Sequence, residues 1–191
     1  MADDREASSV DLLSRAGAGD ASAFAGLVRR YERTVFSLAL RMLSDRRDAE
    51  DLSQDVFIRL YRQGPRVESD AHLGFWLRKV TANLAIDRLR RGRRLAAVLM
   101  ADAPEDAVGL GSPDPVFNRR LLGLVAELAP PARAVLLLRY QEDMDPADIA
   151  RALDMPVNTV KSHLKRAIAT LRQRLGRHMN DGDQHPGASA P

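Results

Sequence analysis

Apolar residues recur with the period of an α-helix along almost the whole chain, and no stretch alternates apolar and polar residues as a half-buried strand does. From Phe24 to Met42 they fall on one helical face, and Asp20 stands four residues earlier, where an aspartate caps a helix. The same period runs through 48–62 and Leu73–Arg91. The pattern predicts an all-α protein built from amphipathic helices.

The helical pattern breaks between Gly92 and Pro115, where proline, glycine and acidic residues accumulate. That composition is typical of a flexible linker, although residues 94–101 are apolar enough to extend the preceding helix by a turn. The chain therefore reads as two small helical domains on one tether. The expected boundaries are 1–19 for an N-terminal segment, 20–94 and 116–178 for the domains, 95–115 for the linker and 179–191 for a disordered tail.

The C-terminal domain has the pattern of a helix–turn–helix. Asp145 is a suitable N-cap and Pro146 suits the first helical position, so we expect helices over Pro146–Leu153 and Val157–Arg177 with a short turn between them. The second helix has one apolar stripe, consisting of Val157, Val160, Leu164, Ile168, Leu171 and Leu175. Its other face fits a DNA major groove and carries Asn158, Thr159, Lys161, Ser162, Lys165 and Arg166.

A second cationic helix is expected over Leu73–Arg91. Arg88, Arg90 and Arg91 gather near its end, and the one tryptophan of the chain, Trp76, lies near its start. Cations with nearby aromatic rings suit a nucleic-acid strand, because phosphates pair with the cations and bases stack on the rings. Two alternatives stay open: Trp76 belongs to the core, and the arginines form a helix-end cluster favoured by the macrodipole.

Composition excludes several classes of site. The chain has no cysteine, which removes disulfides, thiolate nucleophiles and cysteine-based metal sites. Its four histidines show no metal spacing, and no phosphate-binding glycine motif is present. The first residues, MADDREASSVDLL, are acidic and polar rather than a signal peptide, and no apolar run approaches the roughly 20 residues that span a bilayer. We expect a cytoplasmic protein with no catalytic site, metal, cofactor or membrane insertion.

The order of motifs resembles the bacterial sigma factors of RNA polymerase, specifically the extracytoplasmic function (ECF) group. Four segments carry the resemblance, which extends from about Asp20 to Arg177: GDASAFAGLVRRYERTVFSLALRML, DAEDLSQDVFIRLYR, FWLRKVTANLAIDRLRR and LAPPARAVLLLRYQEDMDPADIARALDMPVNTVKSHLKRAIATLR. The resemblance implies a factor that binds core RNA polymerase, directs it to one promoter class and has no active site of its own. The N-terminal domain would be a sigma region 2 and the C-terminal domain a sigma region 4.

The resemblance also implies protein partners. The segment DAEDLSQDVF is similar to the helix that grips the clamp helices of the polymerase β′ subunit; the β flap and an anti-sigma factor are the other implied partners. An acidic cluster of this kind, taken alone, reads as a solvated helix face. The residues implied to bind core polymerase are Asp48, Glu50, Asp51, Gln54 and Asp55.

The loop over residues 64–73 and the helix after it are similar to the element that melts and reads the minus-ten DNA in this family. One base of the non-template strand is flipped there, at an energetic cost of a few kcal/mol. Relatives often carry aromatic residues where Val67 and Leu73 stand, so the resemblance does not define the preferred base. The implied contacts are Val67, Ser69, Asp70, His72, Trp76, Lys79, Asn83, Arg88, Arg90 and Arg91, and His72 reads equally well as an ordinary loop histidine.

The helix–turn–helix is similar to the module that binds the minus-thirty-five element. Asp154 stands where relatives often have glycine, and aspartate tolerates the left-handed backbone of such a turn better than most residues. Arg133 and Arg139 are implied to touch phosphates. With them, the minus-thirty-five set consists of Asn158, Thr159, Lys161, Ser162, Lys165 and Arg166.

Two other functions fit the same features. A stand-alone dimeric helix–turn–helix regulator would bind its promoter without polymerase. A helical adaptor would use the basic faces to bind acidic proteins instead of DNA. Promoter binding by the chain alone would favour the regulator, and run-off transcription with core polymerase separates a sigma factor from both.

Overall fold

The structure is a computed structural model that describes residues 7–63, 66–99 and 115–181. These residues form eight helices and no strand, which confirms the all-α expectation. Most of the expected linker and tail lies outside the described residues. The helices are α1 (Ser9–Gly17), α2 (Ala21–Leu43), α3 (Arg46–Gln63), α4 (Asp70–Leu99), α5 (Pro115–Ala126), α6 (Pro130–Tyr140), α7 (Pro146–Leu153) and α8 (Val157–Asp181).

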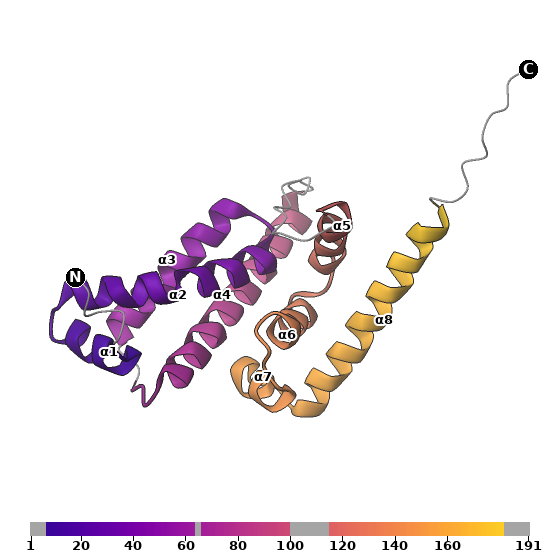
Figure 1. Ribbon diagram of the computed structural model, residues 1–191. Helices are drawn as coiled ribbons and strands as arrows, with labels where there is room; N and C mark the ends of the chain where they lie inside the picture. Colours follow the sequence, from indigo (N-terminus) through magenta and orange to yellow (C-terminus); the bar gives the residue numbers. More distant parts are fainter. Residues whose placement is uncertain (1–6, 64–65, 100–114, 182–191) are drawn as a thin grey trace, which may run out of the picture.

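The first four helices form one bundle, in which α2 contacts α1, α3 and α4 (Figure 1). Leu27, Leu38, Leu52 and Leu60 are fully buried between them, because the apolar stripes of three amphipathic helices meet there. The cap expected at the start of α2 is confirmed: Asp20 Oδ1 accepts from the backbone N–H of residue 22 at 2.9 Å and of residue 23 at 3.1 Å.

Helix α1 belongs to this bundle, whereas the sequence suggested only an N-terminal segment. Leu12 is fully buried, and Ser8 caps the helix by accepting from the Asp11 N–H. The N–H of Ser9 donates to Asp70 Oδ1, at the start of α4, at 2.7 Å. The first turn of α1 is therefore fixed to the beginning of a helix 61 residues further along the chain.

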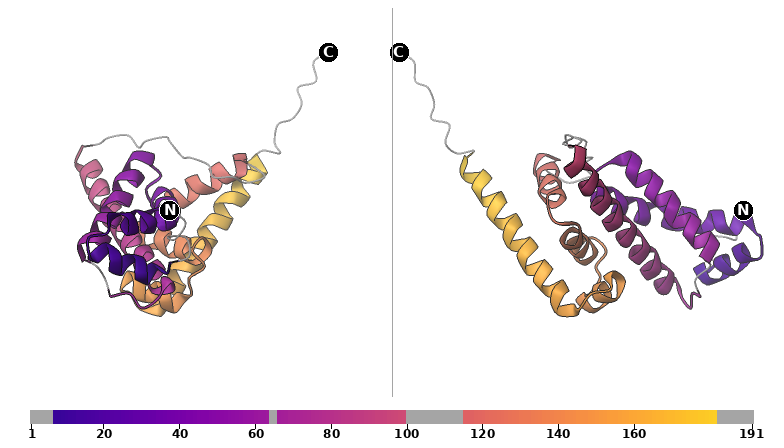
Figure 2. Two further views of the ribbon diagram at one scale, coloured as in Figure 1. Left: turned by 60° about the vertical axis from the view of Figure 1, so that its left-hand side comes forward. Right: turned by 180° about the vertical axis from the view of Figure 1, so that it is seen from behind.

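The last four helices form the second unit, in which α8 packs on α5, α6 and α7. Leu138, Ile149 and Val160 are fully buried within it. Figure 2 shows α8 along one side of the molecule, with its far end projecting beyond the other helices. The boundaries of α7 agree with the expected Pro146–Leu153.

The two units also pack against each other: α4 contacts α6 and α7, and α2 contacts α5 and α6. The sequence predicted modules connected only by a tether, so this packing is a finding of the structure. Helix α4 also continues to Leu99, eight residues beyond the expected Arg91, and takes up the first residues of the expected linker. The turn that residues 94–101 were expected to add is thus helical as far as Leu99.

Candidate nucleic-acid interface

The exposed face of α8 contains the residues expected to meet duplex DNA. Val160 is fully buried and Ala167 is 2% exposed. Because this side of α8 packs inward, the opposite, polar side faces solvent. Val157, the first residue of α8, was expected in the apolar stripe but is 37% exposed. Thr159 is half-buried, and the exposed members of the set are Asn158, Lys161, Ser162, Lys165 and Arg166.

Local backbone chemistry fixes the turn before α8. Asp145 Oδ1 accepts from the N–H groups of Ala147 and Asp148 at 2.8 Å each, so the expected N-cap of α7 is confirmed. Asp154 ends α7 with φ 51° and ψ 53°, and its N–H donates to the Ala150 carbonyl. The left-handed residue expected at this turn is confirmed as well, and together the two aspartates fix where α8 begins.

His163 lies among the cations of this face and is half-buried. Its pKa is lowered, first by desolvation and then by the nearby Arg166 cation. The imidazole is therefore neutral at pH 7, since the ordinary pKa of histidine is already about 6.5. The positive charge of the face comes from Lys161, Lys165 and Arg166.

The second expected nucleic-acid surface follows α4. His72, Lys79, Arg90 and Arg91 are exposed, and Trp76 is half-buried against the core. Trp76 packs partly against the core, and its contact with a nucleic acid stays a prediction. These residues share one helix, which brings the aromatic ring and the cations onto one element.

Two other members of the minus-ten set, Asn83 and Arg88, are hydrogen-bonded within the protein. Asn83 Nδ2 donates to the Lys79 carbonyl at 2.9 Å and to the Ala152 carbonyl of α7 at 2.8 Å. Arg88 donates to the carboxylate of Asp55 at 2.5 Å. In this arrangement neither Asn83 nor Arg88 presents its donors to a nucleic acid as expected, because packing partners accept them.

Residues in and just after the loop before α4 make hydrogen bonds and packing contacts that the sequence did not predict. Ser69 Oγ accepts from the His72 N–H at 3.1 Å and caps the helix. Asp70 accepts from Ser9 and lies 3.7 Å from the Arg30 guanidinium. Val67 is half-buried and packs against the core. Of the expected loop, residues 64 and 65 lie outside the described residues.

Arg133 corrects one expectation. Its side chain is only 3% exposed, and Nη1 donates to the Met42 carbonyl of α2 at 2.5 Å. A residue buried between the two units cannot touch a DNA phosphate in this arrangement. Arg139, by contrast, is half-exposed and donates to the Met144 carbonyl at 3.1 Å, so its guanidinium lies beside the turn that precedes α7.

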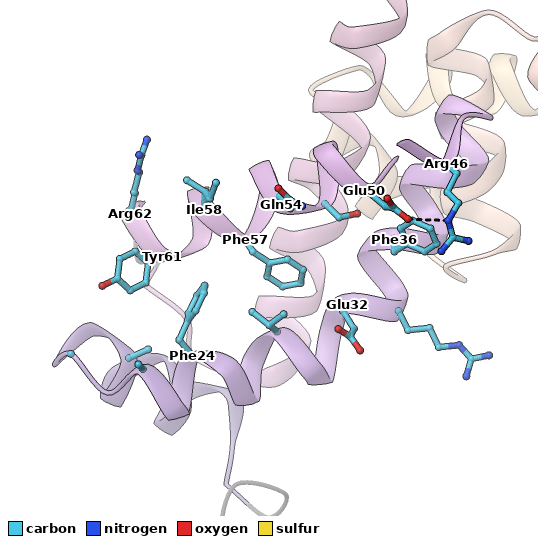
Figure 3. Close-up of a pocket in the computed structure, with 16 residues that line it drawn as sticks. Phe24, Glu32, Phe36, Arg46, Glu50, Gln54, Phe57, Ile58, Tyr61 and Arg62 are labelled. Atoms are coloured by element: carbon cyan, nitrogen blue, oxygen red, sulfur yellow. Dashed lines mark hydrogen bonds and ion pairs between the residues drawn. The ribbon is translucent and has the colours of Figure 1, made fainter. Parts of the chain in front are cut away.

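Two of the five residues expected to bind protein, Glu50 and Gln54 of α3, line a groove of about 1090 Å³ between α2 and α3 (Figure 3). Phe24 and Tyr61 both line it and make an edge-to-face contact with ring centroids 5.1 Å apart. Ile58 is 46% exposed and Tyr61 is 62% exposed. Asp48, Glu50, Asp51, Gln54 and Asp55 are all exposed.

The groove was missed from the sequence, which grouped Phe24 and Tyr61 with the core. The available signal was their helical phase. Leu52, Val56 and Leu60 already supply the buried stripe of α3, so further large apolar residues at other phases point away from it. An exposed apolar groove bordered by carboxylates is typical of a protein-docking surface.

Comparison with known protein families identifies both helical units. Residues 27–95 match Sigma-70 region 2, and residues 118–171 match Sigma-70, region 4. The chain belongs to the ECF group of RNA polymerase sigma factors. The ECF factor SigW of Bacillus subtilis is 30% identical over 174 residues, covering 82% of this chain and 91% of SigW. SigM of Mycobacterium tuberculosis is 31% identical, covering 93% of this chain and 89% of SigM.

Two solved structures share the fold of this sigma factor. The sigma factor RpoE, in complex with the anti-sigma factor NepR from Bartonella quintana, superposes with a TM-score of 0.68 at 20% identity, covering 80% of this chain and 96% of that one. CnrH, in complex with the cytosolic domain of CnrY, gives 0.61 at 23% identity, covering 92% and 99%. Within the described ranges of this sigma factor, no helix is both long and apolar enough to cross a bilayer.

Proposed function

We propose that this sigma factor binds core RNA polymerase and reads two promoter elements, the minus-thirty-five duplex with α8 and the minus-ten strand with α4 and its preceding loop. The observation that carries the proposal is the exposed polar and cationic face at the start of α8, opposite the fully buried Val160. A recognition helix places such side chains at base edges in the major groove. Membership of the ECF group supports this role over that of a stand-alone dimeric regulator.

Core polymerase binds, in this proposal, through α3. Its five exposed polar and acidic residues supply acceptors for cationic groups of the β′ clamp helices, and the groove beside them offers Ile58 and Tyr61 as apolar contacts. Such a mixture of apolar anchors and polar rim fits a protein interface. Region 4 would contact the β flap.

An anti-sigma factor is the proposed regulator. RpoE, whose fold this chain shares, was solved in a complex with the anti-sigma factor NepR, and CnrH in a complex with the cytosolic domain of CnrY. We expect the regulator to cover the α2–α3 groove and Asp48 to Asp55, because that would exclude polymerase. A co-complex that left this face exposed would contradict the expectation.

Run-off transcription with purified core polymerase tests the function. The expected result is a promoter-dependent product that requires both components, with start sites mapped after overexpression supplying the two promoter motifs. Replacing both Asn158 and Lys161 with alanine should reduce the product, whereas Gln173→Ala, exposed further along α8, should not. Tight promoter binding by the pure chain at physiological salt, without polymerase, would favour a stand-alone regulator.

A further inference from the structure

A polar network joins α1 and α2 to the first residue of α4, beside the loop that is proposed to read the minus-ten strand. Its centre is Ser9, the first residue of α1, which is fully buried. Ser9 Oγ lies 2.9 Å from the Tyr31 hydroxyl and accepts from Arg30 Nη1 at 3.1 Å. The backbone N–H of Ser9 donates to Asp70 Oδ1 at 2.7 Å. Three segments that are far apart in the sequence therefore meet at one residue.

The hydrogen bonds of this network can all be satisfied in one direction. A guanidinium has only N–H donors, so Ser9 Oγ accepts from Arg30 and its own O–H is left to donate to Tyr31. The Tyr31 hydroxyl can then donate to the Asp70 carbonyl, which lies 3.4 Å away. The Asp70 carboxylate also lies 3.7 Å from the Arg30 guanidinium. Asp70 is thus held through its backbone and its side chain, by partners on two other helices.

The network contributes geometry more than stability to the docking of α1. Leu12 and Ala16 already bury the apolar side of this helix against the bundle, and apolar burial is the main favourable contribution to folding. A buried hydrogen bond replaces bonds to water, so its net contribution to stability is modest. A fully satisfied buried network does, however, specify one arrangement of the groups that it joins. Here that arrangement fixes the position of Asp70 relative to Ser9 and Tyr31.

Asp70 connects the network to the described end of the loop. Val67 packs against the core, and Ser69 Oγ accepts from the His72 N–H, so residues 67, 69 and 70 are each anchored to the bundle or to α4. The exposed side chains of Ser69, Asp70 and His72, which are proposed to meet DNA, therefore start from a defined backbone. Reading a base outside the stack already costs the free energy of unstacking. A loop that is preorganised adds no further cost of ordering on binding.

We propose that Ser9 and Tyr31 are positioning residues for minus-ten recognition, which act through Asp70 to hold residues 67–72 in the conformation that binds the DNA strand. The proposal rests on the proposed function, because it requires that this loop reads the minus-ten strand. Neither residue contacts DNA in this role, since Ser9 is fully buried and the Tyr31 hydroxyl is directed at Ser9 and Asp70. Their loss changes recognition only through the loop.

The test removes one hydroxyl at a time. Tyr31→Phe retains the half-buried ring and loses the hydroxyl that lies against Ser9 and the Asp70 carbonyl. Ser9→Ala removes the hydroxyl at the centre of the network and is the second variant if the first fails to fold. Thr81→Val is the matched control, because Thr81 is also fully buried but its hydroxyl donates to the Leu77 carbonyl within α4.

Loop mobility is measured first, in the full-length chain without DNA or polymerase. The chain contains no cysteine, so Glu68→Cys in the loop and Gln173→Cys in α8, both exposed, each accept one nitroxide label in separate chains. We expect the electron paramagnetic resonance line shape at position 68 to show faster motion in both network variants and no change in Thr81→Val. The line shape at position 173 should stay constant in all variants, which excludes general loosening of the fold.

Recognition is then measured with unlabelled holoenzyme and a fluorescent single strand that carries the minus-ten motif obtained from transcript-start mapping. Fluorescence anisotropy compares this strand with one in which the motif is scrambled. The preference for the motif should fall about fivefold in Tyr31→Phe and Ser9→Ala, because the loop must then be ordered on binding, and should stay constant in Thr81→Val. Binding to a duplex that carries only the minus-thirty-five element should be equal in all variants.

An unchanged line shape at position 68 in both network variants overturns the inference. A more mobile loop with an unchanged preference for the motif overturns its role in recognition. If the parent holoenzyme shows no preference for the motif, the minus-ten part of the proposed function is contradicted, whereas a more mobile loop in the variants still supports the positioning of the loop by the network. The two claims therefore fail separately.

Discussion

The guanidinium of Arg88 in α4 donates to the carboxylate of Asp55 in α3 at 2.5 Å and to the Asp48 carbonyl at 3.0 Å. One arginine of the proposed minus-ten surface is therefore attached to two residues of the proposed polymerase surface. Arg90 and Arg91, two and three residues further along α4, stay exposed. Arg88 links α4 to α3, whereas Arg90 and Arg91 remain accessible to phosphates.

The side chains of Arg88 and Asp55 should contribute only a small coupling energy to the free energy of unfolding, as measured with Arg88→Ala and Asp55→Ala. The Asp55 side chain is 52% exposed and that of Arg88 is 24% exposed, so a double-mutant cycle on the free energy of urea unfolding should give about 0.5–1 kcal/mol. The coupling should shrink in 1 M salt, where the screening length is about 3 Å. A coupling of zero at low salt would contradict the pairing.

The cap of α7 should matter to the helix–turn–helix. Asp145→Ala removes the acceptor for two backbone N–H groups and should lower the free energy of unfolding by about 1 kcal/mol. Asp145→Asn retains a capping oxygen and should restore most of that loss. Equal destabilisation by alanine and asparagine, in urea titrations followed by circular dichroism, would contradict a capping role.

Features governed by local rules could be predicted from the sequence. The Asp20 and Asp145 caps and the left-handed Asp154 each depend on residues within four positions, and a capping or turn preference acts at that range. The exposed face of α8 followed for the same reason, because helical phase alone separates Lys161 and Lys165 from Val160.

Features governed by contacts between distant segments could not be predicted. Arg133 has the composition of a phosphate contact, yet its partner is 91 residues away, in α2. Asn83 meets a carbonyl 69 residues away, and Leu12 was passed over because a single apolar turn in a polar segment gives little periodicity. Nothing in the local pattern around Asn83 or Arg133 indicates that the two units pack together.

At acidic pH, the free energy of unfolding should depend on the charge of Asp20. Hydrogen bonds from Ser22, then from Arg15 and the Ala23 N–H, hold the pKa of its carboxyl well below the ordinary value. A lowered native pKa adds stability above the unfolded pKa of about 3.9, and that stability is lost as pH falls below it. Asp20→Asn should flatten this slope below about pH 4 in urea titrations, and an unchanged slope would contradict the assignment.

The effect of salt on DNA binding should distinguish residues of α8 that contact bases from those that contact phosphates. If Asn158 reads a base edge, Asn158→Ala should weaken binding of the holoenzyme to its own promoter by about 1–3 kcal/mol and relax specificity at one position. If Lys165 contacts a phosphate, Lys165→Ala should weaken binding to all DNA sequences alike. It should also lower the slope of the logarithm of the binding constant against the logarithm of salt concentration by about one. Filter binding over a salt series checks both, and identical profiles for the two variants would contradict the division.

Gly74 should report on the ion pair in which Arg78 Nε of α4 donates to Glu142 Oε2, after the end of α6, at 2.7 Å. It lies four residues before Arg78 in α4, and a methyl group there would come within 2.9 Å of Arg78 Nη1. Gly74→Ala should therefore move the guanidinium away from Glu142 by a few tenths of an ångström while raising the helix propensity of α4 by up to about 1 kcal/mol.

We expect Gly74→Ala to gain less free energy of unfolding than Gly123→Ala in α5, because only the methyl group at position 74 displaces Arg78 from Glu142. Gly123→Ala is the matched control, because a methyl group there meets nothing within 4 Å. Both changes add helix propensity, so the difference between them in urea titrations reports on the Arg78–Glu142 pair. Equal free energies of unfolding for the two variants would contradict displacement of Arg78.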